Sequence, residues 1–249
     1  MIITVCPLIF VAGFVDSIAG GGGLISLPAY LFAGLPVHYA YGTNKLSSTF
    51  GTMFSAFRFL KNGKIHLKSA VAAVISALFG SYLGAKAALA LSDIYLRYFL
   101  IIMLPVAAVF IITRKKFGEE NRISYLSGFK IFGLSLLIGL VMGVYDGFFG
   151  PGTGTFLILL FTGVIGFNLT VASGNAKLVN LASNIAALVT FSADSKVFFE
   201  LGIPAAIFGI AGNWLGSGLA IKNGAKIIKP VLVVVIILLF AKILYDVFK

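Results

Sequence analysis

The segment Gly13–Ser48, GFVDSIAGGGGLISLPAYLFAGLPVHYAYGTNKLSS, decides the fold because it places an aspartate, a run of four glycines and a lysine among apolar residues. Apolar residues lead up to Asp16 and continue after Gly23, so the glycine run interrupts a hydrophobic segment. Unwound backbone inside a membrane is tolerated only where it is buried in protein or lines a polar cavity. The segment therefore predicts a broken membrane helix with a polar site at the break.

The composition of the chain excludes most soluble proteins. Of the 249 residues, 59% are hydrophobic and 11% are charged, and the mean hydropathy is +1.06. A soluble globular domain carries about 25% charged residues, so this composition excludes most soluble enzymes and free-standing binding modules. The apolar runs are continuous and do not alternate in polarity, which excludes a transmembrane β-barrel. We therefore expect an all-α polytopic membrane protein.

The hydrophobic runs divide the chain into ten segments. Two of them, Leu24–Leu35 and Thr155–Phe167, span about 18 Å at 1.5 Å per residue, less than the roughly 30 Å of a hydrocarbon layer. Each short segment follows a glycine-rich break, so we expect two half-helices. The other eight segments are Ile2–Ala19, Tyr39–Leu60, Ser69–Leu91, Ile94–Thr113, Ile131–Phe149, Leu169–Phe191, Val197–Ile221 and Ile227–Phe248.

The two halves of the chain match each other at a nearly constant offset. An offset of 130 residues aligns Asp16 with Asp146, and an offset of 132 residues aligns Lys45 with Lys177. Self-similarity of this kind predicts an internal duplication. The expected parts are a first transmembrane repeat at 1–118, a linker at 119–125 within a central basic loop at 114–130, and a second transmembrane repeat at 126–249.

Two arrangements of the repeats fit these segments. Five crossings in each half make the repeats inverted relative to each other, whereas re-entrant half-helices give parallel four-span repeats and eight spans. The loop around Lys64 is strongly basic, but the matching loop of the second half contains Asp194 and Glu200. Opposite charge bias in equivalent loops favours inverted repeats with the central basic loop in the cytoplasm.

The net charge of +11 does not indicate a nucleic-acid partner, because the basic and aromatic residues form no RNA- or DNA-binding module. Basic residues at helix ends orient a membrane protein and contact anionic lipid. We therefore expect membrane lipid as a partner, no nucleic acid, and leave a homo-oligomer open. Cys6 is the single cysteine, so no internal disulfide can form.

Four charged residues lie inside apolar segments, where charges are costly and commonly functional. They form two repeat-related sets, Asp16 with Asp146 and Lys45 with Lys177. One interpretation is structural: each carboxylate pairs with a lysine or caps a half-helix and holds the break together. In the functional interpretation, the lysines stabilise a bound anion, and the aspartates are proton-coupling or gating groups.

The glycine runs after the two aspartates suit anion binding. Neither run ends in the Gly-Lys-Ser/Thr of a P-loop, but unwound backbone exposes N–H groups, and the next half-helix directs its positive dipole end at the break. Glycines outside the runs, at Gly80, Gly84, Gly212 and Gly216, are expected to let helices pack closely. Besides the two lysines, the candidate substrate-binding residues are Gly21, Gly22, Gly23, Gly152, Thr153, Gly154, Thr43, Asn44 and Asn175.

Residues for other chemistry are scarce. His38 and His66 have no second ligand nearby in the sequence, so we predict no metal site. We also expect no cofactor and no enzyme activity, because no nucleophile with a base and no HExxH-like spacing occurs. Without an ATP-binding element, primary active transport by this chain alone is not expected either.

The segments 13–48 and 143–184, the second reading GVYDGFFGPGTGTFLILLFTGVIGFNLTVASGNAKLVNLASN, resemble the two signature halves of the sulfite exporter TauE/SafE family. The resemblance covers essentially the whole chain and implies a multi-pass transporter of the prokaryotic inner membrane for a small anion. We expect a proton-coupled secondary transporter that moves a sulfur-containing oxyanion or organosulfonate, with the anion held between the two breaks. A passive anion channel and a transporter of small carboxylates are the alternatives.

Overall fold

The computed structural model describes residues 1–90, 118, 120 and 126–248. Every regular element in these residues is helical, as predicted. The predicted segment Ile94–Thr113 and most of the central basic loop lie outside the described residues. The helices are α1 (Ile2–Ala19), α2 (Gly23–Phe32), α3 (Val37–Lys61), α4 (Leu67–Ala90), α6 (Gly128–Phe148), α7 (Thr153–Leu160), the π-helix η2 (Phe161–Ile165), α8 (Leu169–Ala193), α9 (Phe199–Asn223) and α10 (Ala225–Phe248).

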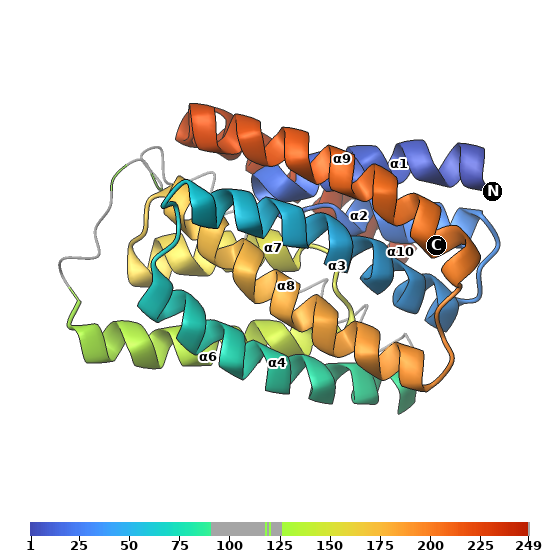
Figure 1. The fold of residues 1–249 in the computed structure, drawn as a ribbon, viewed down its shortest axis with the longest axis horizontal. Coiled ribbons are helices and arrows are strands. Elements are labelled where there is room, and N and C mark those ends of the chain that lie inside the picture. Colours follow the sequence, from blue (N-terminus) through green and yellow to red (C-terminus); the bar gives the residue numbers. More distant parts are fainter. Residues whose placement is uncertain (91–117, 119, 121–125, 249) are drawn as a thin grey trace.

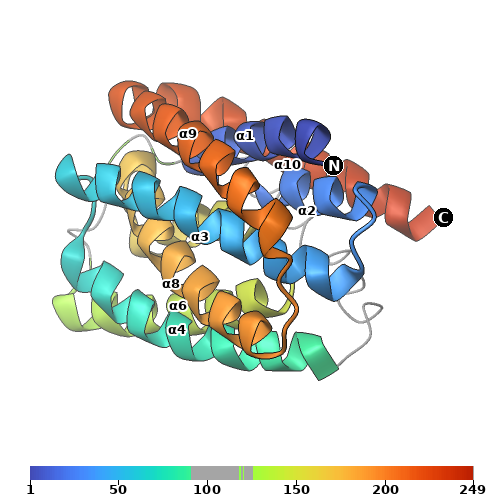
Figure 2. The same ribbon diagram turned by 45° about the vertical axis from the view of Figure 1, so that its right-hand side comes forward.

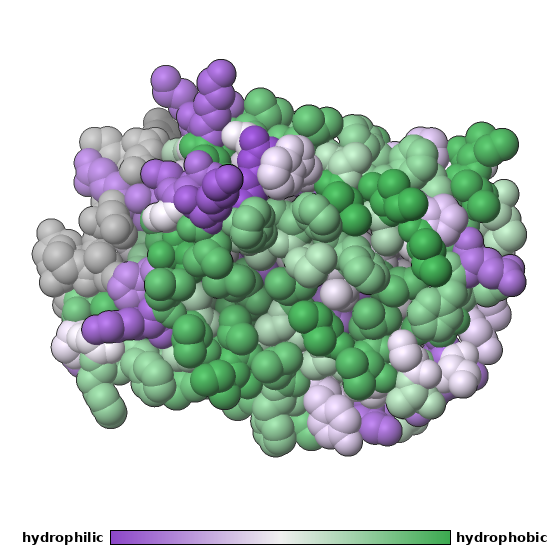
Figure 3. Space-filling model, viewed as in Figure 1, coloured by the Kyte–Doolittle hydropathy of each residue, from purple (hydrophilic) through white to green (hydrophobic). Residues whose placement is uncertain are grey.

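The helices form three layers. In Figures 1 and 2, α1 and α9 pack together on one side, α4 and α6 pack together on the other, and α3 and α8 lie between them. Five of the described helices, α1, α4, α6, α8 and α9, are long and apolar enough to cross a membrane. Hydrophobic side chains cover the middle of the face in Figure 3, while hydrophilic ones gather towards its two ends. This distribution matches a bundle whose helices cross a bilayer.

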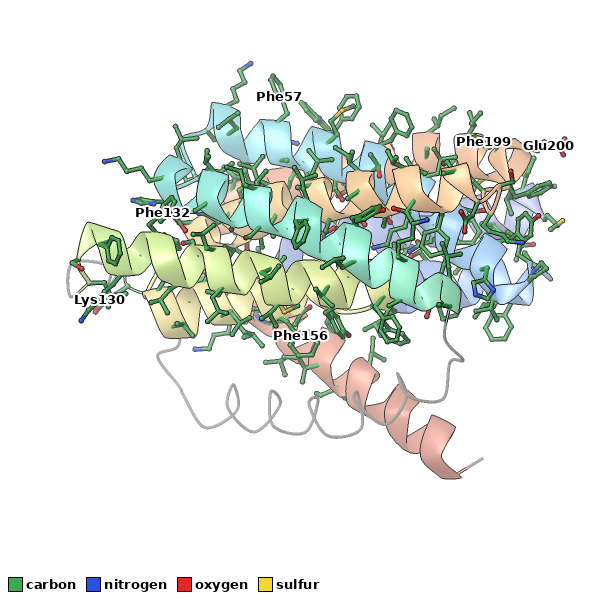
Figure 4. The ribbon with its side chains drawn as sticks, turned by 90° about the horizontal axis from the view of Figure 1, so that it is seen from below. Phe57, Lys130, Phe132, Phe156, Phe199 and Glu200 are labelled. Atoms are coloured by element: carbon green, nitrogen blue, oxygen red, sulfur yellow. The ribbon has the colours of Figure 1, made fainter. Side chains whose placement is uncertain are left out.

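The polar side chains of α3 face the interior of the bundle, and its large apolar side chains face outward. Phe57 is 56% exposed and points away from the bundle in Figure 4, as does Phe132 of α6. Membrane helices adopt this arrangement because the lipid accepts apolar groups and the bundle interior can satisfy polar ones. The buried polar residues of α3 are Thr43, Asn44, Lys45, Ser47, Thr49, Thr52 and Ser55.

The two short segments begin after left-handed glycines. α2 has 10 residues and α7 has 8, and α7 continues directly into η2. α1 ends at Gly20, whose φ is 76°, while Gly150 and Gly152 before α7 have φ of 92° and 81°. Glycine reaches these angles without the steric clash of a Cβ, so the glycine runs end the preceding helices as expected.

The two central helices, α3 and α8, run in opposite directions. Gly42, near the start of α3, lies against the carbonyl oxygen of Lys196 in the loop before α9, where an added Cβ would be 2.1 Å from that oxygen. Gly174, near the start of α8, lies against the carbonyl oxygen of Lys64 in the loop before α4, at 2.0 Å from an added Cβ. Each of these helices therefore starts where the other ends, which makes α3 and α8 antiparallel (Figure 1).

Glycines also bring the outer helix pairs into backbone contact, which confirms their predicted packing role. A Cβ added at Gly84 of α4 would lie 2.1 Å from the carbonyl oxygen of Val144 in α6, and one added at Gly212 of α9 would lie 2.1 Å from that of Phe10 in α1. Without these side chains the backbones approach closely and gain dispersion contacts. The same kind of contact is made by Gly80 and Gly216.

Replacement of Gly20 by alanine is expected to destabilise the fold strongly. The new Cβ would meet a left-handed backbone at φ 76° and would lie 2.1 Å from the carbonyl carbon of Gly154. Gly34→Ala is the matched control, because Gly34 has φ of 86° and nothing within 4 Å of its added Cβ. We expect Gly34→Ala to cost about 1–2 kcal/mol and Gly20→Ala about 1–3 kcal/mol more. Thermal unfolding of the purified variants in detergent measures the difference, and equal losses would contradict the contact.

Candidate functional site

The two glycine breaks meet inside the bundle. Gly20 lies against Gly154 so closely that neither position has room for a Cβ, and a Cβ added at Gly23 would be 3.0 Å from the Cα of Pro151. The tip of one break therefore packs on the start of the half-helix that follows the other. In this conformation the contact leaves no space for an anion directly between Gly20 and Gly154, and the described cavity of the site lies beside the first break.

The four charged residues predicted inside the membrane form two ion pairs, and each pair joins the two halves. Lys45 Nζ lies 2.8 Å from Asp146 Oδ2, and Lys177 Nζ lies 2.6 Å from Asp16 Oδ2. The lysine on α3 thus reaches the carboxylate at the end of α6, while the lysine on α8 reaches the carboxylate at the end of α1. The structural interpretation is correct in that each carboxylate pairs with a lysine, but the two pairs have different surroundings.

The pair of Lys45 and Asp146 is enclosed by other polar side chains. Ser183 Oγ donates to Asp146 Oδ2 at 2.6 Å, and Lys45 Nζ donates to Asn184 Oδ1 at 3.0 Å. Asn184 is held in turn by a hydrogen bond from its Nδ2 to Asn180 Oδ1. The side chains of the pair are 2% and 3% exposed. A buried pair with this many partners is satisfied within the protein.

The pair of Asp16 and Lys177 lies at the wall of a cavity. Lys177 is fully buried, but the Asp16 side chain is 16% exposed, and its Oδ1 accepts the backbone N–H of Gly22 at 3.2 Å. The cavity has a volume of about 30 Å³, which suffices for water or a small polar group. It is lined by Ile9, Ala12, Gly13, Asp16, Gly22, Gly23, Ser26, Ser47, Ser48, Thr52, Gly209 and Asn213.

Three predicted binding residues form hydrogen bonds elsewhere in the bundle. Thr43 Oγ1 accepts the N–H of Phe198 at 3.0 Å and so connects α3 to the start of α9. Asn175 Nδ2 donates to the carbonyl of Val171 at 2.8 Å. Asn44 Oδ1 lies 3.5 Å from the hydroxyl of Ser48. None of the three predicted residues lines the described cavity.

The remaining predicted glycines and Thr153 shape the breaks. A Cβ added at Gly21 would lie 2.3 Å from Val235 of α10, so this glycine admits the C-terminal helix. Thr153 Oγ1 donates to the carbonyl of Gly150 at 2.7 Å and closes the turn before α7. Gly152 takes the left-handed angle at the N-cap of α7. Among the predicted residues, Asp16, Gly22 and Gly23 are those that line the cavity.

Sequence reasoning missed most of the cavity wall. Thr52 lies two turns along α3 from Lys45, and Asn213 lies on α9, far from either break in the sequence. The available signal for Asn213 was an amide in the middle of an apolar segment, directly after Gly212. Polar residues in such helices are costly unless they have a partner or a function.

The described residues contain no group of three or more His, Cys, Asp or Glu side chains that could hold a metal ion. Of the two histidines considered for such a site, His66 accepts the backbone N–H of Ser69 at its Nδ1, at 3.3 Å. This contact lies at the start of α4 and has the geometry of a helix cap.

The fold and the two ion pairs together define the class of protein. An apolar outer surface, helices of membrane-spanning length and a polar centre with two buried ion pairs are the features of a multi-pass membrane protein with an internal polar site.

Comparison with known proteins identifies the family. The chain belongs to the family described as sulfite exporter TauE/SafE, which it matches over residues 5–243. It is 34% identical over 237 residues to a "Probable membrane transporter protein" of Haemophilus influenzae, which covers 95% of this chain and 92% of the relative.

Further relatives carry the same description. The chain is 36% identical over 235 residues to the "Probable membrane transporter protein YfcA" of Escherichia coli K12, across 94% of this chain and 86% of the relative. It is 23% identical over 207 residues to the "Probable membrane transporter protein YdhB" of Bacillus subtilis, across 83% and 84% of the two chains. No solved structure matches the chain significantly. The protein is therefore a multi-pass membrane transporter of this family.

Proposed function

We propose that the protein is a secondary transporter that binds a small anion beside the Asp16–Lys177 pair and moves it across the membrane together with a proton. The position of Asp16 carries this proposal. One of its carboxylate oxygens contacts Lys177, the other accepts the N–H of Gly22, and the side chain lines a cavity. At the cavity wall, Asp16 therefore joins a buried cation, Lys177, to a backbone donor, Gly22.

The charge of this site explains how a proton and an anion would bind together. With Asp16 ionised, the pair has no net charge, and a second anion at the cavity would be repelled by the carboxylate. Protonation of Asp16 leaves the charge of Lys177 uncompensated, and an anion can then replace the carboxylate as its partner. Because binding coupling is reciprocal, the anion favours protonation as much as the proton favours the anion.

The family supports a sulfur-containing oxyanion or organosulfonate as the substrate class. Such groups have several acceptor oxygens and a delocalised negative charge, which suits backbone N–H donors at the start of a half-helix. Gly22 and Gly23 line the cavity at the start of α2, and we assign the anionic end of the substrate to this wall. Small carboxylates also have a delocalised negative charge on acceptor oxygens, so acetate is used as a probe as well.

We also propose that residues 1–118 and 126–249 are inverted repeats joined by the linker 119–125. The antiparallel directions of α3 and α8 support this proposal, as do the two ion pairs, which exchange partners between the halves. Transporters built from inverted repeats alternate access by moving one unit against the other around a central site. The contact between Gly20 and Gly154 lies where such a movement would act.

We propose that the basic end of the bundle faces the cytoplasm. Figure 4 shows Lys130 at one end of the bundle and Glu200 at the other. Excess lysine and arginine in short loops marks the cytoplasmic side of membrane proteins. In Figure 1, α3 and α9 end where α6 begins, and α4 starts there as well. The basic residues near these helix ends include Lys61, Lys64, Lys68 and Lys222.

A double variant, Asp16→Asn/Lys177→Met, tests the assigned site without leaving one charge unpaired. We expect its uptake of sulfite, ethanesulfonate or acetate into proteoliposomes, whichever the wild type takes up, to fall at least about tenfold, because a hydrogen bond to a charged group contributes about 1.5–3 kcal/mol. The control is the double variant Glu200→Gln/Lys222→Met, because both of these residues are exposed. Wild-type uptake by a folded double variant would contradict the site.

The same vesicles separate a coupled transporter from a passive channel. An imposed pH gradient is expected to accumulate the anion inside the vesicles above its external concentration. A channel would only equilibrate it.

A further inference from the structure

Asn213 of α9 carries a buried acceptor that no described residue satisfies. The side chain is 3% exposed. Its Nδ2 donates to the carbonyl of Gly209 at 3.0 Å, whereas its Oδ1 accepts no hydrogen bond from the part of the chain that the structure describes. A buried acceptor without a partner costs about 1–3 kcal/mol, so a retained one needs an explanation.

The amide of Asn213 is fixed in its orientation. Exchanging its two ends would place Oδ1 beside the carbonyl oxygen of Gly209, and two acceptors would then face each other. The helices around the amide leave just enough room for it, since a Cβ added at Gly13 or Gly51 would lie 2.7 or 2.5 Å from Nδ2. Glycines on α1 and α3 thus accommodate this side chain, and Oδ1 is the end that remains available.

Asn213 lines the same cavity as Asp16 and Gly22. The cavity therefore combines the ion-paired carboxylate and a backbone N–H at the first break with an unsatisfied acceptor contributed by α9. Ser47, another lining residue, is already engaged, because its hydroxyl accepts from Tyr30 at 2.8 Å and donates to the carbonyl of Asn44 at 3.1 Å. Asn213 is thus a cavity-lining residue whose Oδ1 is buried and accepts no hydrogen bond from the described residues.

The other half of the chain shows that the unsatisfied acceptor is not required by the helix packing. Ser81 of α4 lies 132 residues before Asn213 and occupies the matching position against α6. Its hydroxyl donates to the carbonyl of Ser183 at 2.6 Å, so this position is satisfied within the protein. It lies beside the enclosed pair of Lys45 and Asp146, whereas Asn213 lies beside the pair at the cavity.

We propose that the cavity selects an anion that also carries a hydrogen-bond donor, an O–H or N–H group, and that Asn213 Oδ1 accepts this hydrogen bond. The inference rests on the proposed anion site at Asp16 and Lys177 and narrows its substrate class. A fully ionised oxyanion without such a group offers acceptors alone, so Asn213 Oδ1 would stay unsatisfied and face another negative atom. Sites built to bond a substrate hydroxyl discriminate strongly against analogues that lack it.

Two matched pairs of probes test this selection in proteoliposomes: 2-hydroxyethanesulfonate against ethanesulfonate, and hydroxyacetate against acetate. We expect the wild type to take up the hydroxylated member of at least one pair at least about tenfold faster. Asn213→Ala is expected to reduce that preference to less than about threefold by slowing the hydroxylated probe alone. Asn213→Ser, which introduces the residue found at position 81, is a second variant if alanine impairs folding.

Asn223→Ala is the matched control, because Asn223 is an exposed amide on the same helix that also donates to the carbonyl four residues earlier, that of Leu219. It should leave the preference unchanged. Equal uptake of both members by the wild type, or a preference that survives both Asn213 variants, would overturn the inference while leaving the anion site intact. Failure of the anion site itself would appear separately, as wild-type uptake by Asp16→Asn/Lys177→Met.

Discussion

Asp16→Asn is expected to bind the transported anion at least about tenfold more tightly than the wild-type protein at pH 8, and its affinity should change less between pH 5 and pH 8 than that of the wild type. The asparagine has the shape of the protonated carboxyl and no charge, so no carboxylate competes with the anion for Lys177. In the wild type, the carboxylate 2.6 Å from Lys177 competes with the anion until it is protonated. At effective dielectric constants of about 20, unit charges 4 Å apart interact by about 4 kcal/mol.

The same variant should lose proton-driven accumulation. Because the asparagine cannot take up a proton, a pH gradient can no longer drive anion uptake, whereas exchange of anion for anion requires no net proton movement and should persist. Calorimetric titration at the two pH values measures the first effect, and uptake into proteoliposomes with and without a pH gradient measures the second. Both measurements use whichever of sulfite, ethanesulfonate and acetate the wild-type protein takes up.

Glu200→Gln controls for the loss of a carboxylate as such. Glu200 is exposed at the end of the bundle opposite Lys130, so its replacement should change neither the pH dependence of binding nor accumulation. If Asp16→Asn bound the anion with the same pH dependence as the wild type, the coupling group would have to be a different residue.

Lys45→Met is expected to lower the free energy of unfolding by about 3–5 kcal/mol, the usual effect of removing one partner from a buried ion pair. Asp146 is 2% exposed, and among the described residues it would keep Ser183 as a side-chain donor. The loss arises because the remaining carboxylate is desolvated without a cation. Asp146→Asn should be destabilising for the converse reason, since Lys45 would retain Asn184 as a partner but no opposite charge.

The double variant Lys45→Met/Asp146→Asn should recover more than half of the larger single loss, because neither uncompensated charge remains. Thermal unfolding of the purified proteins in detergent gives the comparison, and Lys222→Met, at an exposed position, should be close to neutral. Additive losses in the double variant would show that the two side chains do not stabilise each other.

The hydrophobic pattern was enough to predict the helical class and the two short segments. Each prediction depends on properties of neighbouring residues: the apolar runs favour burial in lipid, and the glycine runs at 20–23 and 150–152 permit left-handed backbone where other residues are strained. The charged residues of the site were also found from the sequence, because Asp16 and Lys177 stand out in apolar surroundings.

The pairing of those charges could not be predicted. Asp16 and Lys177 form an ion pair although they are 161 residues apart in the sequence. From the sequence alone, Lys45 and Lys177 were equally suitable partners for Asp16. Which lysine meets which carboxylate depends on the antiparallel packing of α3 and α8. That packing depends on the close contacts at Gly42 and Gly174, which local sequence patterns do not reveal.

By itself, the sequence determined that this protein is a helical membrane protein with four interior charges at two glycine breaks, because transfer free energy and backbone freedom belong to individual residues and their neighbours. Only the tertiary structure decided that the charges pair across the halves and that Asp16 lines a cavity. The physical reason is packing: Ser183 and Asn184 enclose one pair, while the small residues Gly13 and Gly209 and the amide of Asn213 leave space beside the other.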